Sequence, residues 1–341
     1  MLDLLKELIS VHAFSGREHA LAALITERLT PLADKVYTDR LGNVIGVIYG
    51  GGEDKKKLMY AAHMDEIGMI VTYIEDNGYI RFTNNGFPNW TSLAYREVVF
   101  EGGAHGMVVP EVGCDANPHP EKMYADIGTH SREETEEYVQ IGDCFAACNT
   151  ITEMAGTVVA GRPIDNRIGC AVLLKLAERL HNREDKPYHD TYLVFTVQEE
   201  IALPDVGGSV ASYGITPDIG VAVDVCATGD AKGALPMDSK VGGGAVVQIR
   251  DNTAIFDRDL VRHMISACEE KTIPYQRLVA YNGGTDAVPM QKVGLGCKTG
   301  AIGIPMRYLH TSAEISDIAD AEACVDLCAA LCDRPMETAS V

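Results

Sequence analysis

The sequence contains no apolar run that approaches the length of a membrane-spanning helix, and its mean hydropathy is near zero. Such a helix needs about 20 consecutive apolar residues, so no segment is predicted to cross a bilayer. The N-terminal segment MLDLLKELIS is amphipathic and acidic, and it lacks the basic start and the small-residue cleavage site of a signal peptide. We therefore expect a cytoplasmic protein.

Positive charge is scarce, because 29 lysines and arginines face 49 aspartates and glutamates, for a net charge of −20. Nucleic acids and anionic membranes are bound through basic patches, so this balance argues against both as partners. The ten cysteines occur without a secretion signal, which indicates free thiols in a reducing compartment. Cys324, Cys328 and Cys332 recur every four residues, and we expect them to pack in the core along one helix face.

Helix and strand patterns alternate in two stretches of the chain, and a β-rich stretch separates them. Apolar residues recur at helical spacing in residues 2–10 and 17–30, and helices are also predicted for residues 257–271 and 316–332. Between residues 68 and 158, short β-like pieces alternate with Gly, Asn and Pro turns, which is typical of a small barrel or an all-β insert.

The order of these stretches predicts two domains. We expect residues 1–67 and 159–341 to form one α/β domain, in which a mainly parallel sheet is covered by helices. Residues 68–158 are then an inserted β-rich domain, because plain loops of that length are uncommon in compact proteins.

His63 and Asp65 stand at the end of the apolar segment KLMYAAHMD, which is predicted to be a buried strand. Side chains two residues apart lie on one face of a strand. One of the two can bind a metal while the other orients it through a hydrogen bond. The alternative is a purely structural pair.

Acids also follow other predicted strands, where open α/β sheets place their sites. Glu199 and Glu200 come after TYLVFTV, where buried carboxylates are costly unless they are solvated, paired or metal-bound. We expect one of them to bind a metal and the other to transfer protons. Asp224 interrupts the apolar strand VAVDVCA, which favours a functional role for the same reason.

Two further segments are less specific. Asp165 in GRPIDNRIG directly precedes a long predicted helix, so a helix N-cap is the alternative to a metal ligand. His310 in MRYLHTSAEIS would be structural if it acted alone. Together, nitrogen and oxygen donors without thiolate suit Zn²⁺, Co²⁺ or Mn²⁺, and two such ions would share a bridging carboxylate.

The motifs HMDEIG, DNR, QEE, the Asp-ended strand, GGTDA and HTSAE occur in the order found in the tetrahedral (TET) metalloaminopeptidases, which this sequence resembles along essentially its whole length. That family includes glutamyl and deblocking aminopeptidases, and some members carry the name endoglucanase. The resemblance implies a zinc-peptidase-like α/β fold and two divalent metal ions in each subunit. It also implies that the β-rich insert is a dimerisation domain and that dimers assemble into a hollow dodecamer.

The resemblance also implies roles for single residues. His63 and Asp224 would bind one ion, Glu200 and His310 the other, and Asp165 would bridge the two, with Glu199 as general base and Asp65 orienting His63. Independently of the resemblance, Gly283, Gly284 and Thr285 are predicted to form a turn that could bring backbone donors to the substrate, and plain turn chemistry is the equal alternative.

The sequence departs from the family beside this site. Relatives have an acid pair where this chain has Asp165 and Asn166, and residues 201–208 lack the Arg-Gly-Ala of relatives and add a Pro and an Asp. This altered loop leaves the preferred N-terminal residue open. Cys226, two residues after Asp224, is hypothesised to line the pocket and make the enzyme sensitive to thiol reagents; a buried, inert thiol is the alternative.

The leading hypothesis is a dinuclear-metal aminopeptidase that removes N-terminal residues from short peptides. A glycoside hydrolase using paired carboxylates is the main alternative, although that chemistry does not require His63, Asp224 and His310. A scaffold with a structural metal would favour thiolate ligands. A carboxypeptidase or deacylase would need a cation for the substrate carboxylate, and no motif singles one out. The metal and the choice between dimer and dodecamer stay open.

Overall fold

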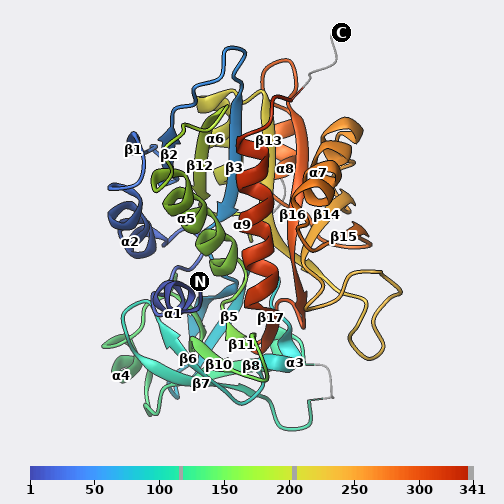
Figure 1. Ribbon diagram of the computed structural model, residues 1–341. Coiled ribbons are helices and arrows are strands. Elements are labelled where there is room, and N and C mark those ends of the chain that lie inside the picture. The colour runs from blue at the N-terminus through green and yellow to red at the C-terminus, as the bar shows by residue number, and fades with distance from the viewer. Residues whose placement is uncertain (115–117, 202–205, 337–341) are drawn as a thin grey trace.

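A computed structural model describes residues 1–114, 118–201 and 206–336 of the chain, and Figure 1 shows its two parts. The upper part is a large sheet covered by helices, and the lower part is a small barrel. Half of the altered loop, residues 202–205, lies outside the described residues.

The large sheet contains eleven strands in the described residues, and its main path runs β1-β2-β12-β3-β13-β16-β17-β11-β10. β14 and β15 extend it beside β16. The strands are β1 (Lys35–Thr38), β2 (Val44–Ile48), β3 (Lys57–His63), β10 (Thr150–Glu153), β11 (Val158–Arg162), β12 (Asp190–Thr196), β13 (Ile219–Ala227), β14 (Ala245–Arg250), β15 (Tyr275–Val279), β16 (Lys298–Arg307) and β17 (Glu314–Asp317).

The sheet is mixed, because the four central strands β12, β3, β13 and β16 run parallel while β1, β2, β17, β11 and β10 pair antiparallel. β3 and β13 are buried along almost their whole length, as expected for parallel strands that are covered on both faces. The parallel order predicted from the alternation of helix and strand therefore applies to the centre of the sheet, where the candidate residues lie.

Helices cover both faces of the sheet. α5 (Arg167–His181) and α9 (Ile318–Cys332) pack together in front of it in Figure 1, with α1 (Leu2–Ile9) and α2 (His19–Leu29) against α5 and α7 (Arg258–Lys271) against α9. α6 (Val206–Ile215) and α8 (Ala287–Gln291) contact each other behind it. Cys324, Cys328 and Cys332 are fully buried on α9, which confirms the predicted core face.

The small barrel is closed by six antiparallel strands in the order β4-β5-β8-β7-β6-β9. They are β4 (Gly68–Ile74), β5 (Ile80–Asn85), β6 (Arg96–Phe100), β7 (His105–Pro110), β8 (Met123–Asp126) and β9 (Cys144–Ala147), with α3 (Trp90–Leu93), α4 (Arg132–Glu136) and a 3₁₀ turn η1 (Pro120–Lys122) between strands. Its interior is a hydrophobic cluster of its own, centred on stacked Phe100 and Phe145.

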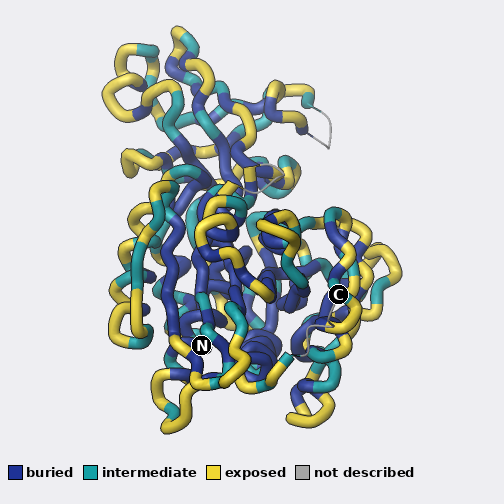
Figure 2. The backbone as a smooth tube through the Cα atoms, turned by 90° about the horizontal axis from the view of Figure 1, so that it is seen from above, coloured by how far each residue is buried: buried dark blue, intermediate teal, exposed yellow. Residues whose placement is uncertain are grey.

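The barrel lies within the predicted insert, whereas β10, near the end of that range, pairs with β11 in the large sheet. The division at residues 68 and 158 stays a prediction. Figure 2 shows buried residues running through the interior of both parts and exposed residues on the outer turns. Among the described residues, no helix combines the length and the apolar character that crossing a membrane requires.

Candidate metal centre

The candidate residues meet at one edge of the sheet. His63 is the last residue of β3, and its partner in the register of β12 is Thr196, so Glu199 and Glu200 leave the sheet beside it. Asp224 lies in β13, the parallel neighbour of β3. The carboxyl ends of parallel strands share one edge of a sheet, which is why segments far apart in sequence deliver side chains to one place.

The first group of potential metal ligands, called the His63 cluster, consists of His63, Asp165 and Asp224. Nε2 of His63 lies 3.2 Å from Oδ1 of Asp165 and 3.6 Å from Oδ1 of Asp224. All three residues are buried.

The second group, the His310 cluster, consists of Asp165, Glu200 and His310. Nε2 of His310 lies 3.4 Å from Oδ2 of Asp165 and 3.4 Å from Oε2 of Glu200. Within each cluster, the potential ligand atoms lie within 4.8 Å of one another. Asp165 thus turns one carboxylate oxygen toward each histidine, and the two clusters share it.

Asp165 does not cap the helix that follows it, so the N-cap interpretation is wrong. Asn166 is the cap of α5, because its side-chain oxygen accepts a hydrogen bond from the backbone N–H of Gly169. The departure from the family at Asn166 therefore supplies the cap and leaves both oxygens of Asp165 facing the histidines. Oε2 of Glu314 accepts hydrogen bonds from the backbone N–H groups of Ile164 and Asp165, which fixes the backbone of this turn.

The donor set fits divalent cations. Burial raises the pKa of Asp224 to about 6 and that of Glu200 to about 8. For His310, burial opposes the charged ring, but Glu200 and Asp165 outweigh it and raise the pKa to about 10. One buried oxygen of Glu200, Oε1, has no hydrogen-bond partner among the described residues. Several carboxylates are thus buried around two histidines, and nitrogen and oxygen donors of this kind suit Zn²⁺, Co²⁺ or Mn²⁺.

Glu199 lies beside the His63 cluster but belongs to neither group. Its Oε2 atom is 3.9 Å from Nε2 of His63, and its side chain is 11% exposed. Burial raises the pKa of Glu199 well above its usual range, and the charges of Asp224 and Glu200 add to this effect while His63 opposes it. A carboxyl group of this kind is suited to accept and return a proton.

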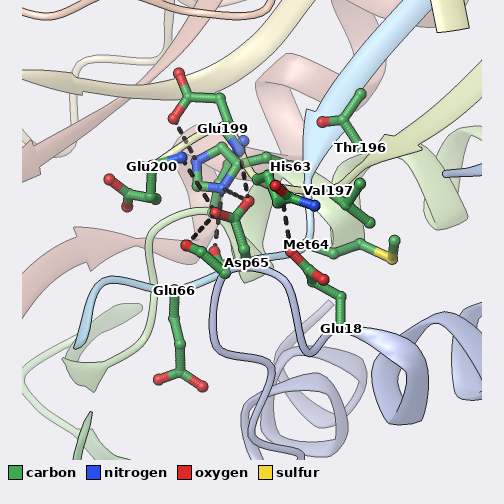
Figure 3. A network of polar contacts seen from close by, with 12 residues as sticks. Glu18, His63, Met64, Asp65, Glu66, Thr196, Val197, Glu199 and Glu200 are labelled. Carbon is green, nitrogen blue, oxygen red and sulfur yellow. Dashed lines mark hydrogen bonds and ion pairs between the residues drawn. The ribbon is translucent and has the colours of Figure 1, made fainter. Parts of the chain in front are cut away.

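Asp65 makes more contacts than the sequence predicted. Its backbone carbonyl lies 3.1 Å from Nδ1 of His63, and its Oδ1 atom lies 3.4 Å from the same nitrogen. Its two carboxylate oxygens also accept hydrogen bonds from the backbone N–H groups of Glu199 and Glu200 (Figure 3). Oδ2 accepts a further hydrogen bond from the hydroxyl of Ser15. Asp65 thus contacts both His63 and the chain that carries the two glutamates.

His310 is held by the barrel part of the chain. Its Nδ1 atom lies 3.2 Å from the carbonyl oxygen of Phe87, and its own carbonyl accepts a hydrogen bond from the backbone N–H of Asn89. A hydrogen on Nδ1 donates to Phe87 and leaves Nε2 free for a metal. His310 also has a φ of +60°, in the left-handed region that non-glycine residues rarely adopt.

A cavity of about 430 Å³ opens beside the two clusters. Gly283, Gly284 and Thr285 line it, as does Cys226. The Cys226 side chain is 6% exposed and belongs to a small apolar cluster, and burial raises the pKa of its thiol strongly. Its location in the pocket agrees with the hypothesis, whereas its chemistry favours the inert thiol.

Sequence reasoning missed several residues around the site. Glu66 and Glu314 lie inside quoted motifs, but neither was given a role. Glu18 lies in the predicted helix of residues 17–30, and Asn43 belongs to none of the motifs. Each is buried and bonds the backbone of a segment distant in sequence, a contact that leaves no periodic signal in the sequence.

Comparison with known proteins gives consistent matches. The sequence model described as M42 glutamyl aminopeptidase matches residues 42–327. A putative aminopeptidase of Acetivibrio thermocellus is 37% identical over 96% of this chain and 97% of its own length. The lysyl aminopeptidase of Pyrococcus furiosus is 30% identical over 98% of each chain.

Solved structures share the fold. Aminopeptidase APDkam598 from the archaeon Desulfurococcus kamchatkensis superposes with a TM-score of 0.92 at 32% identity, covering 98% of this chain and 94% of that one. The Pyrococcus horikoshii TET1 peptidase, described as assembling into a tetrahedron or a large octahedral shell, gives 0.87 at 31% identity and coverage of 98% and 99%. A Thermotoga maritima structure named endoglucanase gives 0.80 at 27% identity, with 96% of each chain covered.

Proposed function

This chain belongs to the M42 glutamyl aminopeptidase family, and we propose that it is a dinuclear-metal aminopeptidase that removes N-terminal residues from short peptides. Family membership makes it a peptidase. The observation that supports the finer proposal is the placement of Asp165, which turns one carboxylate oxygen toward each histidine of two neighbouring clusters.

In this proposal the His63 cluster would hold one divalent ion and the His310 cluster the other, with Asp165 contributing to both. When bound, the ions would lower the pKa of a water molecule and polarise the scissile carbonyl. Their identity among Zn²⁺, Co²⁺ and Mn²⁺ is left open by the donor set, because nitrogen and oxygen ligands suit all three.

The residues of the chain would do the rest. Glu199, as general base, takes the proton of the attacking water and later delivers it to the leaving amine. Asp65 orients His63 and holds the backbone of Glu199 and Glu200, while Glu314 holds the backbone of Asp165. Binding of the free α-amine of the peptide in this centre would restrict cleavage to the N-terminal residue.

The charge of the cavity bears on substrate preference. Among the described residues that line it, Asp251 is the charged residue outside the candidate centre, and neither Lys nor Arg is present. One buried oxygen of Asp251, Oδ2, also has no hydrogen-bond partner there. Because an acidic side chain would be buried without a Lys or Arg partner among the described residues of the cavity, we expect N-terminal Glu to be disfavoured relative to Leu or Lys.

A single panel of chromogenic aminoacyl substrates tests reaction class, metal dependence and preference together. Chelation is expected to lower activity by at least about 100-fold, because removing the ions removes the water activation that they supply. Adding back Zn²⁺, Co²⁺ or Mn²⁺ should restore it. The Glu substrate should show a kcat/KM at least about tenfold below those of the Leu and Lys substrates, as burial of an unpaired carboxylate implies.

Results of the opposite kind would count against the proposal. Hydrolysis of aminoacyl substrates that persists after the metals have been removed would exclude the dinuclear mechanism. Cellulose hydrolysis that survives chelation would favour the glycoside hydrolase, whose paired carboxylates need no metal. A kcat/KM that is highest for the Glu substrate would refute only the argument from the charge of the cavity. It would leave the proposed mechanism intact.

Self-association is part of the same proposal. By analogy with the tetrahedral assembly described for the Pyrococcus horikoshii relative, the barrel would form a dimer and dimers a dodecamer in the cytoplasm. The mass of the purified protein by light scattering should then be a multiple of the 36.8 kDa chain, with twelve copies expected. A monomer at all concentrations would contradict it.

A further inference from the structure

The turn that carries Glu199 and Glu200, residues 197–200, is held by side chains from distant segments. Its four successive backbone N–H groups donate to side-chain oxygens at 3.0–3.1 Å. The N–H of Val197 donates to Asn43, and that of Gln198 donates to Glu18. Those of Glu199 and Glu200 donate to Asp65 (Figure 3).

These bonds matter because the turn pairs with no strand among the residues that the structure describes. β12 ends at Thr196, and Gln198 then adopts a φ of +56°, in the left-handed region that is unfavourable for a residue with a side chain. The direction of the Glu199 side chain depends on this backbone reversal. Gln198 is the residue whose left-handed conformation reverses the chain. The group that accepts the hydrogen bond from its N–H therefore helps to fix this conformation.

Glu18 supplies that acceptor. It precedes α2, but its side chain makes no cap hydrogen bond to the helix. Its Oε1 atom instead accepts from the backbone N–H of Gly16 at 2.7 Å and from that of Gln198 at 3.0 Å. The residue is 5% exposed, and no ion pair of Glu18 occurs among the described residues.

The surroundings of Glu18 disfavour its charge. Burial raises the pKa of its carboxyl to about 7, and the nearby charge of Asp65 adds to this effect. Glu18 therefore acts on the turn mainly as a hydrogen-bond acceptor and less through negative charge. Its Oε1 atom can accept hydrogen bonds in either protonation state.

We propose that Glu18 is a positioning residue for Glu199, holding Gln198 in its left-handed conformation so that the Glu199 carboxylate faces the His63 cluster. The proposal rests on the role of Glu199 as general base given above. It assigns a catalytic consequence to the N-terminal segment, which contributes no residue to either metal cluster.

Two conservative substitutions of Glu18 distinguish the position of its side-chain oxygen from its negative charge. Glu18→Gln keeps the oxygen at the same reach and loses the charge, whereas Glu18→Asp keeps the charge and withdraws the oxygen. We expect kcat of Glu18→Gln to stay within about threefold of wild type and kcat of Glu18→Asp to fall about 10- to 100-fold, since displacements near 1 Å have effects of that size. KM and bound metal should change little in both.

The matched control is Glu7→Asp. Glu7 is an acid of α1 whose exposed ion pair with Arg28 lies away from the candidate centre, so the same shortening should leave kcat unchanged. If Glu18→Asp does not fold, Glu18→Met replaces it, because methionine fills a similar volume and offers no strong acceptor.

Hydrogen exchange in the metal-free protein gives a readout that does not depend on activity. The amides of residues 197–200 should exchange faster in Glu18→Asp than in wild type, and Glu18→Gln should match wild type. Equal losses of kcat in both variants, or faster exchange without a loss of kcat, would overturn the proposal. Absence of aminopeptidase activity in the wild-type protein would instead contradict the proposed function. Hydrogen exchange would still test whether Glu18 stabilises the conformation of Gln198.

Discussion

Substitution of Glu199 by alanine is expected to lower kcat by about 10²- to 10⁴-fold, the usual contribution of a general acid–base residue. Bound metal, measured by elemental analysis, should stay at the wild-type level, because Glu199 lies outside both clusters of potential ligands. Its nearest approach to them is the 3.9 Å between its Oε2 atom and Nε2 of His63.

The neighbouring acid provides the matched control. Glu200→Ala removes a proposed ligand of the His310 cluster, so it should lose both activity and bound metal. Near-normal turnover of Glu199→Ala would show that the proposed mechanism is wrong. A loss of metal from Glu199→Ala equal to that from Glu200→Ala would show that both acids are ligands.

Substitution of Glu66 by alanine should destabilise the protein by about 3–5 kcal/mol, the usual effect of breaking a buried ion pair on one side. Glu66 is fully buried, with Arg162 at 3.2 Å from Oε2 and Arg167 at 3.3 Å from Oε1. Its loss leaves two buried guanidinium groups without their carboxylate. Urea unfolding measures the change, and Glu111→Ala, which breaks a partly exposed pair with Arg81, should cost about 1 kcal/mol or less.

The effect of Glu66 should also depend on pH. Burial acts to raise the pKa of Glu66, but Arg162, His12 and Arg167 outweigh it and lower the pKa to about 2. A carboxylate with a lowered folded-state pKa stabilises the protein above its unfolded pKa of about 4.5, and this stabilisation is lost as the pH falls toward 2. The stability difference between wild type and Glu66→Ala should therefore shrink on acidification, and a difference that grew would contradict this assignment.

Part of the candidate centre has a local signal in the sequence, whereas Asp165 and His310 were assigned only through the family resemblance. Asp224 interrupts an apolar strand, and His63, Glu199 and Glu200 follow apolar runs, where polar groups need a partner. The order of the motifs then supplied the shared carboxylate, Asp165. The roles of these residues as ligands and base stay predictions, although the fold brings them within a few ångströms of one another.

Contacts between side chains and distant backbone were not predictable in this way. Glu18 has the sequence context of a helix start, and α2 does begin at His19, but its carboxyl group turns away from the helix to Gln198. The choice of Asn166 rather than Asp165 as helix cap differs from the expectation by one residue, which pattern reasoning does not resolve. The sequence pattern of the antiparallel outer strands does not differ from that of the parallel central strands, so their direction could not be predicted.

The contact between His310 and residues 87–89 limits how this protein can be reduced in size. An engineer who removed the barrel to obtain a smaller catalyst would also remove the carbonyl of Phe87 and the amide of Asn89, which together hold that histidine. A shortened protein would need a substitute for both contacts. The barrel part of the chain thus stabilises the position of His310 in the His310 cluster, and it cannot be removed without affecting that cluster.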